Sequence, residues 1–89
     1  MNAYELFSYN VKYYREQIHA SQEDLAWSTH LSTSFISKVE RGVSFPNFKS
    51  IVKIADALEI PTFALFVTVE EYQAMEESRV QFNTEKMGV

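Results

Sequence analysis

Apolar residues recur along this chain with the period of an α-helix, in short segments separated by residues that cap or break helices. The first segment has apolar residues at successive spacings of one, four, three and four, namely Leu6, Phe7, Val11, Tyr14 and Ile18. This spacing places them on one side of a helix over about residues 3–17. Glycine and proline occur only twice each, which favours helices over hairpins.

Serine residues mark the starts of the next two helices. Ser21 and Asp24 form a capping-box pattern, in which the serine hydroxyl accepts an early backbone N–H, and predict a helix over about residues 22–29. Ser32 is a second suitable N-cap and predicts a helix over about residues 33–41. Two short helices with about three residues between them have the spacing of a helix-turn-helix, whose second helix enters the major groove of DNA.

Gly42 and Asn47 mark the end of the third helix and the start of the fourth. A glycine just past a helix end adopts the left-handed conformation at little cost. Asn47, after Pro46, can cap a helix over about residues 48–59, which ends before Pro61. The residues predicted on its buried side are Phe48, Ile51, Ile54, Ala55 and Leu58.

Two more helices are expected in the C-terminal third of the chain. The fifth begins at Pro61 or at the residue after it. Thr68 and Glu71 form a full capping-box pattern for a sixth helix over about residues 69–80. Residues 81–89 are expected to fray. The predicted fold class is therefore all-α.

The composition excludes several classes of protein. The chain has no cysteine, so neither a disulfide framework nor a thiolate metal site is expected. The two histidines have no clustered carboxylates to complete a metal site. The longest mainly apolar stretch, Ile60–Val69, is too short to span a bilayer and does not follow a signal-peptide pattern. We therefore expect a soluble cytoplasmic protein with no metal and no other cofactor.

Charge is unevenly distributed along the chain. The formal net charge of −4 taken alone is unfavourable for binding nucleic acid, because phosphate contacts supply most of the non-specific affinity. Residues 10–53, however, carry six basic against four acidic side chains, a net charge of +2, whereas residues 54–89 carry two against seven, a net charge of −5. A basic middle and an acidic end suit a protein that turns one face toward DNA.

The segment from Asn10 to Phe66, about two-thirds of the chain, closely resembles the DNA-binding domain shared by phage Cro and cI-type repressors, called the XRE family. The resemblance rests on residues that stay in register throughout: Asn10-Val11-Lys12, Arg15-Glu16, Ser21-Gln22-Glu23-Asp24-Leu25-Ala26, Ser32, Phe35-Ile36-Ser37, Glu40-Arg41-Gly42, Pro46, Ile54-Ala55-Asp56-Ala57-Leu58 and Leu65-Phe66. So many spaced positions make a specific signal. The resemblance implies a five-helix Cro/cI-repressor-like helix-turn-helix domain, here with an additional C-terminal helix.

The resemblance implies two kinds of DNA contact. Gln22, at the start of the second helix, is expected to bond a backbone phosphate, helped by the early N–H groups of that helix. Lys38 is the strongest single candidate for reading a base, since an ammonium can donate to guanine O6 and N7. The residues implied in base contacts are Thr33, Ser34, Ser37 and Lys38, and those implied in backbone contacts are Gln22, Ser32, Arg41, Ser44 and Lys49.

The resemblance also implies a largely buried ion pair between Arg15 and Glu40, with a structural role in linking the first helix to the end of the third. The clearest departure from the family pattern is that His19 and His30 stand where glycine is usual. Histidine is among the non-glycine residues that tolerate positive φ, so the backbone can keep its path. Trp27 stands where the family usually has a polar residue, and it covers apolar surface, marks a partner site or lies half-buried.

The C-terminal part of the chain is more apolar than the family pattern. We expect residues 1–68 to form the DNA-binding domain and residues 69–89 to form a C-terminal helix and tail that packs on the domain or dimerises. Exposed apolar patches favour a partner. The residues expected at a homodimer interface are Phe63, Phe66, Val67, Val69, Tyr72 and Met75. Twofold symmetry would place two recognition helices one helical turn, about 34 Å, apart on a pseudo-palindromic site.

The functional prediction is a transcriptional regulator, either a repressor or an autoregulator, that binds a double-stranded DNA operator as a homodimer. The alternative is a protein-binding module, such as an antitoxin that uses the same domain at its operator. A basic partner for the acidic C-terminal half would favour this alternative. An enzyme is not expected, because the chain has no cysteine, no recognisable nucleophile with a base, and no glycine-rich phosphate loop.

Overall fold

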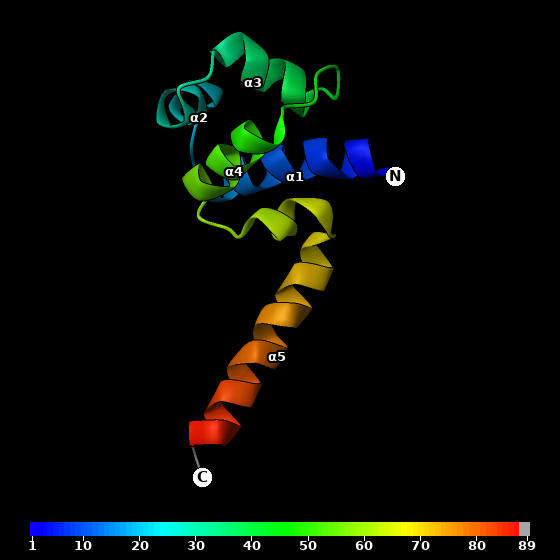
Figure 1. The fold of residues 1–89 in the computed structure, drawn as a ribbon, viewed down its shortest axis with the longest axis vertical. Helices are drawn as coiled ribbons and strands as arrows, with labels where there is room; N and C mark the ends of the chain where they lie inside the picture. Colours follow the sequence, from blue (N-terminus) through cyan, green and yellow to red (C-terminus); the bar gives the residue numbers. More distant parts are fainter. Residues whose placement is uncertain (88–89) are drawn as a thin grey trace.

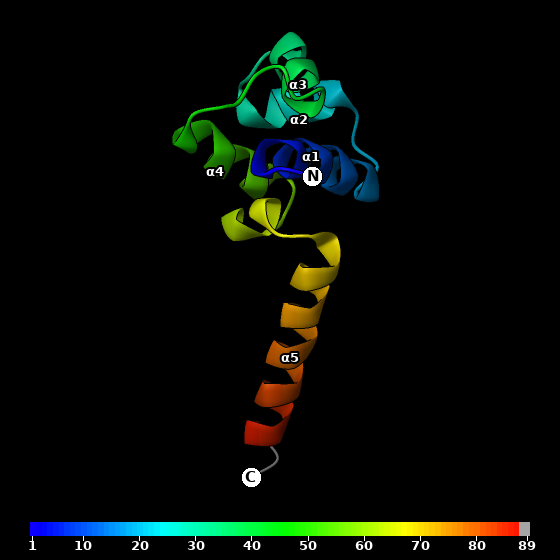
Figure 2. The ribbon, with the colours of Figure 1, turned by 90° about the vertical axis from the view of Figure 1, so that its right-hand side faces the viewer.

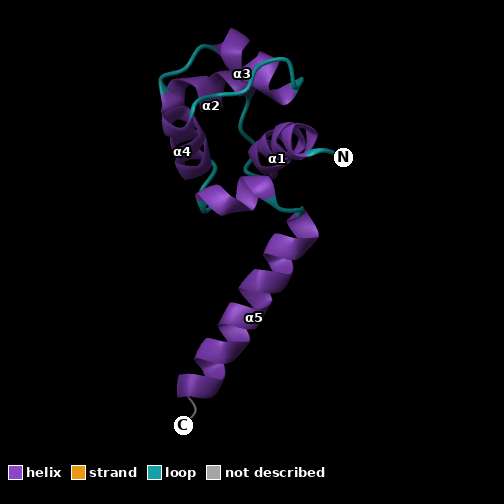
Figure 3. Cartoon of the chain, turned by 45° about the vertical axis from the view of Figure 1, so that its right-hand side comes forward, coloured by secondary structure: helices purple, strands orange, loops and turns teal. Residues whose placement is uncertain are grey.

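The computed structural model describes residues 1–87, and it describes side chains as far as residue 79. Its elements are α1 (Ala3–Gln17), α2 (Gln22–Thr29), α3 (Thr33–Glu40), α4 (Phe48–Ala57), the 3-10 helix η1 (Thr62–Phe66) and α5 (Val69–Met87). Within these residues there is no strand (Figure 3), and no helix is long and apolar enough to cross a membrane. The predicted all-helical fold with an added C-terminal helix is confirmed.

Side chains cap the helices at the predicted residues. Ser21 Oγ accepts the N–H of Asp24 at 2.9 Å, and an Asp24 carboxylate oxygen accepts the N–H of Ser21 at 2.8 Å. Thr68 and Glu71 close the same two bonds at the start of α5. Ser32 Oγ accepts a backbone N–H of α3 at 3.0 Å. Each of these bonds satisfies an N–H group that has no partner within its own helix.

Residues in the left-handed backbone conformation follow the ends of α1 to α4. His19 and His30 have φ values of 57° and 58°, and Gly42 has 76°, so all three predicted positions are confirmed. Glu59, at 63°, is a further such residue that the sequence did not predict. It follows the end of α4 at Ala57, which makes that helix two residues shorter than expected.

The core is formed by the inward sides of α1 to α4 and by η1. Its fully buried side chains include Phe7, Val11, Ile36, Val39, Ile54 and Leu65. The prediction that Phe48 belongs to this core is wrong, because its side chain is 72% exposed. Phe48 is the first residue of α4, and the apolar side of that helix reaches the core only from Ile51, which is 4% exposed.

Helix α5 leaves the domain instead of covering it. Figures 1 and 2 show α5 running away from η1, toward the end of the molecule opposite α3. Only its first turns pack on the core, through Val69, which is 8% exposed, and through Tyr72. The helix continues to Met87, so the predicted end at residue 80 is wrong. Residues 88–89 lie outside the described residues.

Candidate nucleic-acid interface

Helices α2 and α3 pack against one another and set the outward face of α3. Ile36 and Val39 are fully buried, which turns one side of α3 toward the core. By helical periodicity the predicted base-reading residues lie on the opposite side. The structure leaves the side chains of Thr33, Ser34 and Lys38 exposed and that of Ser37 half-buried. The four residues therefore share an accessible surface, at the end of the molecule where Figure 1 shows α3.

Arg41 lies alongside this face. It is the C-cap residue of α3, one position beyond the helix that ends at Glu40, and its side chain is exposed. Its Nε donates to Ser37 Oγ at 3.3 Å, which brings the guanidinium back toward the preceding turn. Arg41 thus adds a second positive charge beside Lys38.

The remaining predicted backbone contacts surround α3. The Ser32 oxygen caps α3 by accepting the N–H of Phe35, and the Ser32 side chain is exposed. Ser44 is half-buried, and its N–H donates to the carbonyl of Lys38 at 3.3 Å, so the loop folds back on the end of α3. Lys49 is exposed in the first turn of α4.

Arg15 and Glu40 form a two-bond ion pair. Arg15 Nε donates to Glu40 Oε2 at 2.7 Å, and Arg15 Nη2 donates to Oε1 at 3.0 Å. A further bond joins Arg15 Nη1 to the carbonyl of Ala20 at 2.8 Å. The hydrogen bond to Glu40 raises the pKa of Arg15 above its usual range, against the opposing effect of burial. The pair joins α1 to the end of α3, as the family resemblance implied.

Gln22 also contacts Glu40, which sequence reasoning missed. Its Nε2 donates to Glu40 Oε1 at 3.0 Å. The two residues are 18 positions apart, so no local pattern could have indicated their contact. Gln22 is half-buried, and the contact places the predicted phosphate-binding side chain next to the ion pair.

Asn10 is a second polar residue whose role was missed. Its side chain is fully buried, and Nδ2 donates to the carbonyls of Leu65 and Val67 at 2.9 and 2.8 Å. These hydrogen bonds join α1 to η1 and to the residue that follows η1. A polar residue inside the apolar stripe of the first helix, within the family motif, was the signal that could have found it.

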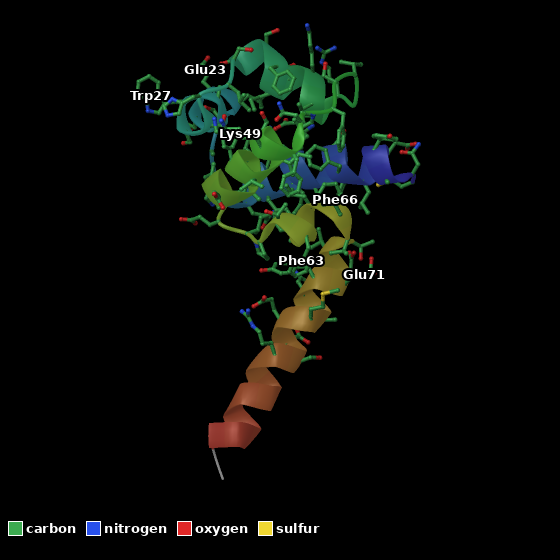
Figure 4. The ribbon with its side chains drawn as sticks, in the orientation of Figure 1. Glu23, Trp27, Lys49, Phe63, Phe66 and Glu71 are labelled. Atoms are coloured by element: carbon green, nitrogen blue, oxygen red, sulfur yellow. The ribbon has the colours of Figure 1, made fainter. Side chains whose placement is uncertain are left out.

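Trp27 projects from the outer side of α2, as Figure 4 shows. Its side chain is 85% exposed, so the alternatives that it lies half-buried or covers apolar surface are wrong. The alternative that Trp27 marks a partner site stays a prediction.

The residues predicted at a dimer interface divide into two groups. Phe63, Phe66 and Met75 are 48%, 40% and 44% exposed, and Figure 4 places both phenylalanines where α5 joins the domain. Val69 and Tyr72 instead pack on the core of their own chain, and Val67 is half-buried. The two groups adjoin where the Phe63 ring packs edge-on against that of Tyr72, and the dimer interface stays a prediction.

The charges are separated along the length of the molecule. Lys38 and Arg41 lie at the α3 end, and the start of α5 carries four acidic residues, Glu70, Glu71, Glu76 and Glu77. Because α5 points away from α3 (Figure 2), its acidic side chains lie away from the basic face. Repulsion between α5 and a polyanion bound at α3 is thereby kept small.

Comparisons with known proteins agree with this geometry. A family model described as helix-turn-helix matches residues 11–65. The restriction-modification controller protein C.AhdI from Aeromonas hydrophila is 34% identical, with 70% of this chain and 94% of that chain covered and a TM-score of 0.68. The hypothetical transcription factor NHTF from Neisseria is 27% identical, with 83% and 85% covered and a TM-score of 0.76.

A third solved structure shares only the fold. The clp gene regulator ClgR from Corynebacterium glutamicum is 16% identical, with 98% of this chain and 90% of that chain covered and a TM-score of 0.71. Comparison with curated protein sequences gives no match. The family model spans well over half of the chain. The matched residues include α2 and α3, which pack against one another as described above. The chain therefore belongs to the XRE-type helix-turn-helix family of DNA-binding transcription regulators, whose members are not enzymes.

Proposed function

We propose that this protein is a cytoplasmic repressor or autoregulator that binds a pseudo-palindromic double-stranded DNA operator as a homodimer. The observation that carries the proposal is the outward face of α3. It presents Ser34 and Lys38 to solvent, holds Arg41 beside Ser37, and lies at the end of the molecule away from the acidic α5. A helix with this exposure can enter a major groove without any rearrangement of the domain.

The side chains on this face divide into base readers and phosphate contacts. Lys38 would donate to guanine O6 and N7, while the short side chains of Thr33, Ser34 and Ser37 suit a thymine methyl group or a water-mediated contact. The proposed phosphate contacts come from residues around α3, namely Gln22, Ser32, Arg41, Ser44 and Lys49. Most of them are neutral, which accords with a protein whose non-specific affinity for DNA is weak.

The proposed homodimer uses the surface where α5 leaves the domain. A helix that projects into water with little packing is marginally stable, and a second copy would cover it. The interface would include the exposed Phe63, Phe66 and Met75 together with the less exposed Val67, Val69 and Tyr72. In this arrangement residues 1–68 form the DNA-binding unit and residues 69–89 complete the dimer.

The likeness to C.AhdI supports a specific version of the proposal. That protein is a restriction-modification controller, and this chain covers 94% of it at 34% identity. We therefore propose a controller role for this protein also, with its own upstream DNA as one candidate target. The antitoxin alternative is favoured by one observation, the 85% exposed Trp27, which offers a protein partner an aromatic anchor on α2.

Selection from random duplex DNA, followed by quantitative binding at physiological salt, tests the proposal. The DNA immediately upstream of the protein's own gene would serve as one test fragment. We expect an inverted repeat with half-sites one helical turn apart, and binding to the upstream fragment. Folded protein that enriches no sequence would overturn the operator proposal and favour a protein-binding role.

A further inference from the structure

Gln22 donates a hydrogen bond to Glu40 that is separate from the ion pair between Glu40 and Arg15. Glu40 Oε1 accepts two hydrogen bonds, from Arg15 Nη2 and from Gln22 Nε2, both at 3.0 Å. The second bond joins the first residue of α2 to the last residue of α3. The Glu40 side chain is 3% exposed, whereas Gln22 is half-buried at the edge of the domain. A buried carboxylate therefore holds a side chain that reaches the surface.

This contact determines which way round the Gln22 amide lies. An ionised carboxylate only accepts hydrogen bonds, so it must face the NH2 group of the amide and not its carbonyl oxygen. The NH2 group has two hydrogens, and Glu40 takes one of them. Among the residues that the structure describes, no other partner is found for the Gln22 side chain. Its second N–H is therefore available to a ligand.

The groups around this N–H favour a phosphate oxygen of bound DNA over a free anion. Gln22 opens α2, where the first backbone N–H groups have no intrahelical acceptor. The nearby carboxylates of Glu23 and Asp24 are exposed and would repel a free anion in solution. A phosphate contact here consequently depends on the rest of the interface to bring the phosphate in.

We propose that Glu40 is a positioning residue for DNA binding: anchored by Arg15, it holds the Gln22 amide so that the second N–H points at one operator phosphate. The inference rests on the proposed DNA-binding function. A free glutamine side chain would lose rotamer freedom each time DNA bound, whereas an amide already held by Glu40 loses that freedom on folding. The ion pair thereby contributes to affinity as well as to stability.

The test uses the selected operator made with a neutral methylphosphonate at one phosphate at a time. In the wild-type protein, replacing the phosphate that Gln22 contacts should lower the affinity for the operator roughly tenfold, because a hydrogen bond to a charged group is lost. We call this loss of affinity the penalty at that position. The position is identified with Gln22→Ala, because in this variant the same replacement should carry no penalty. Lys49→Ala identifies a second position in the same way and serves as the reference.

Two variants separate positioning from a general structural role. The double variant Arg15→Met with Glu40→Leu removes the acceptor without leaving an unpaired buried charge, and the penalty at the Gln22 position should vanish while that at the Lys49 position persists. Arg15→Lys keeps a positive charge beside the buried Glu40 carboxylate, and it should retain both penalties. A Gln22 penalty that survives in the double variant, or a uniform loss at both positions, would overturn the inference.

A measurement on the wild-type protein decides the matter if the double variant does not fold. The Gln22 side-chain amide proton that is bonded to the Glu40 carboxylate should exchange with solvent more slowly, and resonate further downfield, than the corresponding proton of the exposed Gln17. The other Gln22 amide proton should shift when the operator is added. Exchange and chemical shifts like those of Gln17, or no shift with DNA, would overturn the positioning role. Failure of the proposed function would look different, since wild-type protein would then select no operator at all.

Discussion

Arg15 Nε and Glu40 Oε2 lie 2.7 Å apart, with their side chains only 11% and 3% exposed. Removing one partner leaves the other charge buried and unpaired, which costs about 3 to 5 kcal/mol. We therefore expect Arg15→Met to lower the free energy of unfolding by that amount in urea denaturation. The double variant Arg15→Met with Glu40→Leu should recover most of the loss, because apolar side chains of similar volume replace the pair. Equal destabilisation in the single and double variants would show that the pair does not act as a unit.

Lys38 should read a base, because it is exposed on the outward side of α3. Lys38→Ala is expected to weaken binding to the selected operator by about 1 to 3 kcal/mol and to relax preference at one base pair. Lys53→Ala is the charge-matched control, since Lys53 is exposed on α4 outside the helix pair. Fluorescence anisotropy on operator and random duplexes measures both effects. An equal loss on the two duplexes for Lys38→Ala would make it a phosphate contact.

Phe63 should contribute to self-association. Its ring is 48% exposed and packs edge-on against Tyr72, with the ring centroids 5.8 Å apart. Phe63→Glu places a charge in the proposed interface, so sedimentation should shift from dimer toward monomer while circular dichroism shows the same helical content. Trp27→Glu, on the outer side of α2, is the control and should leave sedimentation unchanged. A dimer that survives Phe63→Glu would place the interface elsewhere.

Helix starts were the most predictable feature of this fold, because each depends on residues that are neighbours in sequence. The Ser21–Asp24 and Thr68–Glu71 boxes form as their spacing predicts. The end of α5 was placed too early, since no glycine or proline stops the helix before Met87. A cap is a local signal, whereas a helix end without one depends on its surroundings.

Contacts between distant residues were predictable only where a family pattern supplied them. The Arg15–Glu40 pair came from the resemblance, but the bond from Gln22 to the same carboxylate did not. Phe48 fits the apolar spacing of α4 and is nevertheless exposed, because spacing describes the side of a helix and not where along it the core begins. Sequence reasoning thus located the candidate interface without its internal hydrogen bonds.

His30 holds the turn between α2 and α3 in the left-handed conformation, at φ 58°. This conformation costs an L-residue roughly 1 to 2 kcal/mol, and glycine adopts it freely at some cost in unfolded-state entropy. The His30 side chain is exposed, so little packing is lost on removing it. We expect His30→Gly to raise the free energy of unfolding by roughly 0.5 to 1 kcal/mol. His30→Val should lower the free energy of unfolding, because valine is β-branched. If His30→Val were more stable than His30→Gly, this would argue against strain at this turn.

The capping box that opens α2 should make stability depend on acid. The backbone N–H of Ser21, and then its side chain, lower the pKa of Asp24 below its usual 3.8. A carboxylate with a depressed folded-state pKa stabilises the fold fully above its unfolded value, and that contribution is lost as the pH falls through the folded value. Asp24→Asn keeps an acceptor oxygen but cannot ionise, so wild type should melt at a higher temperature than the variant at about pH 6. The gap should narrow as the pH falls below 3.8, and a gap that stays constant down to about pH 2 would mean that ionisation of Asp24 does not stabilise α2.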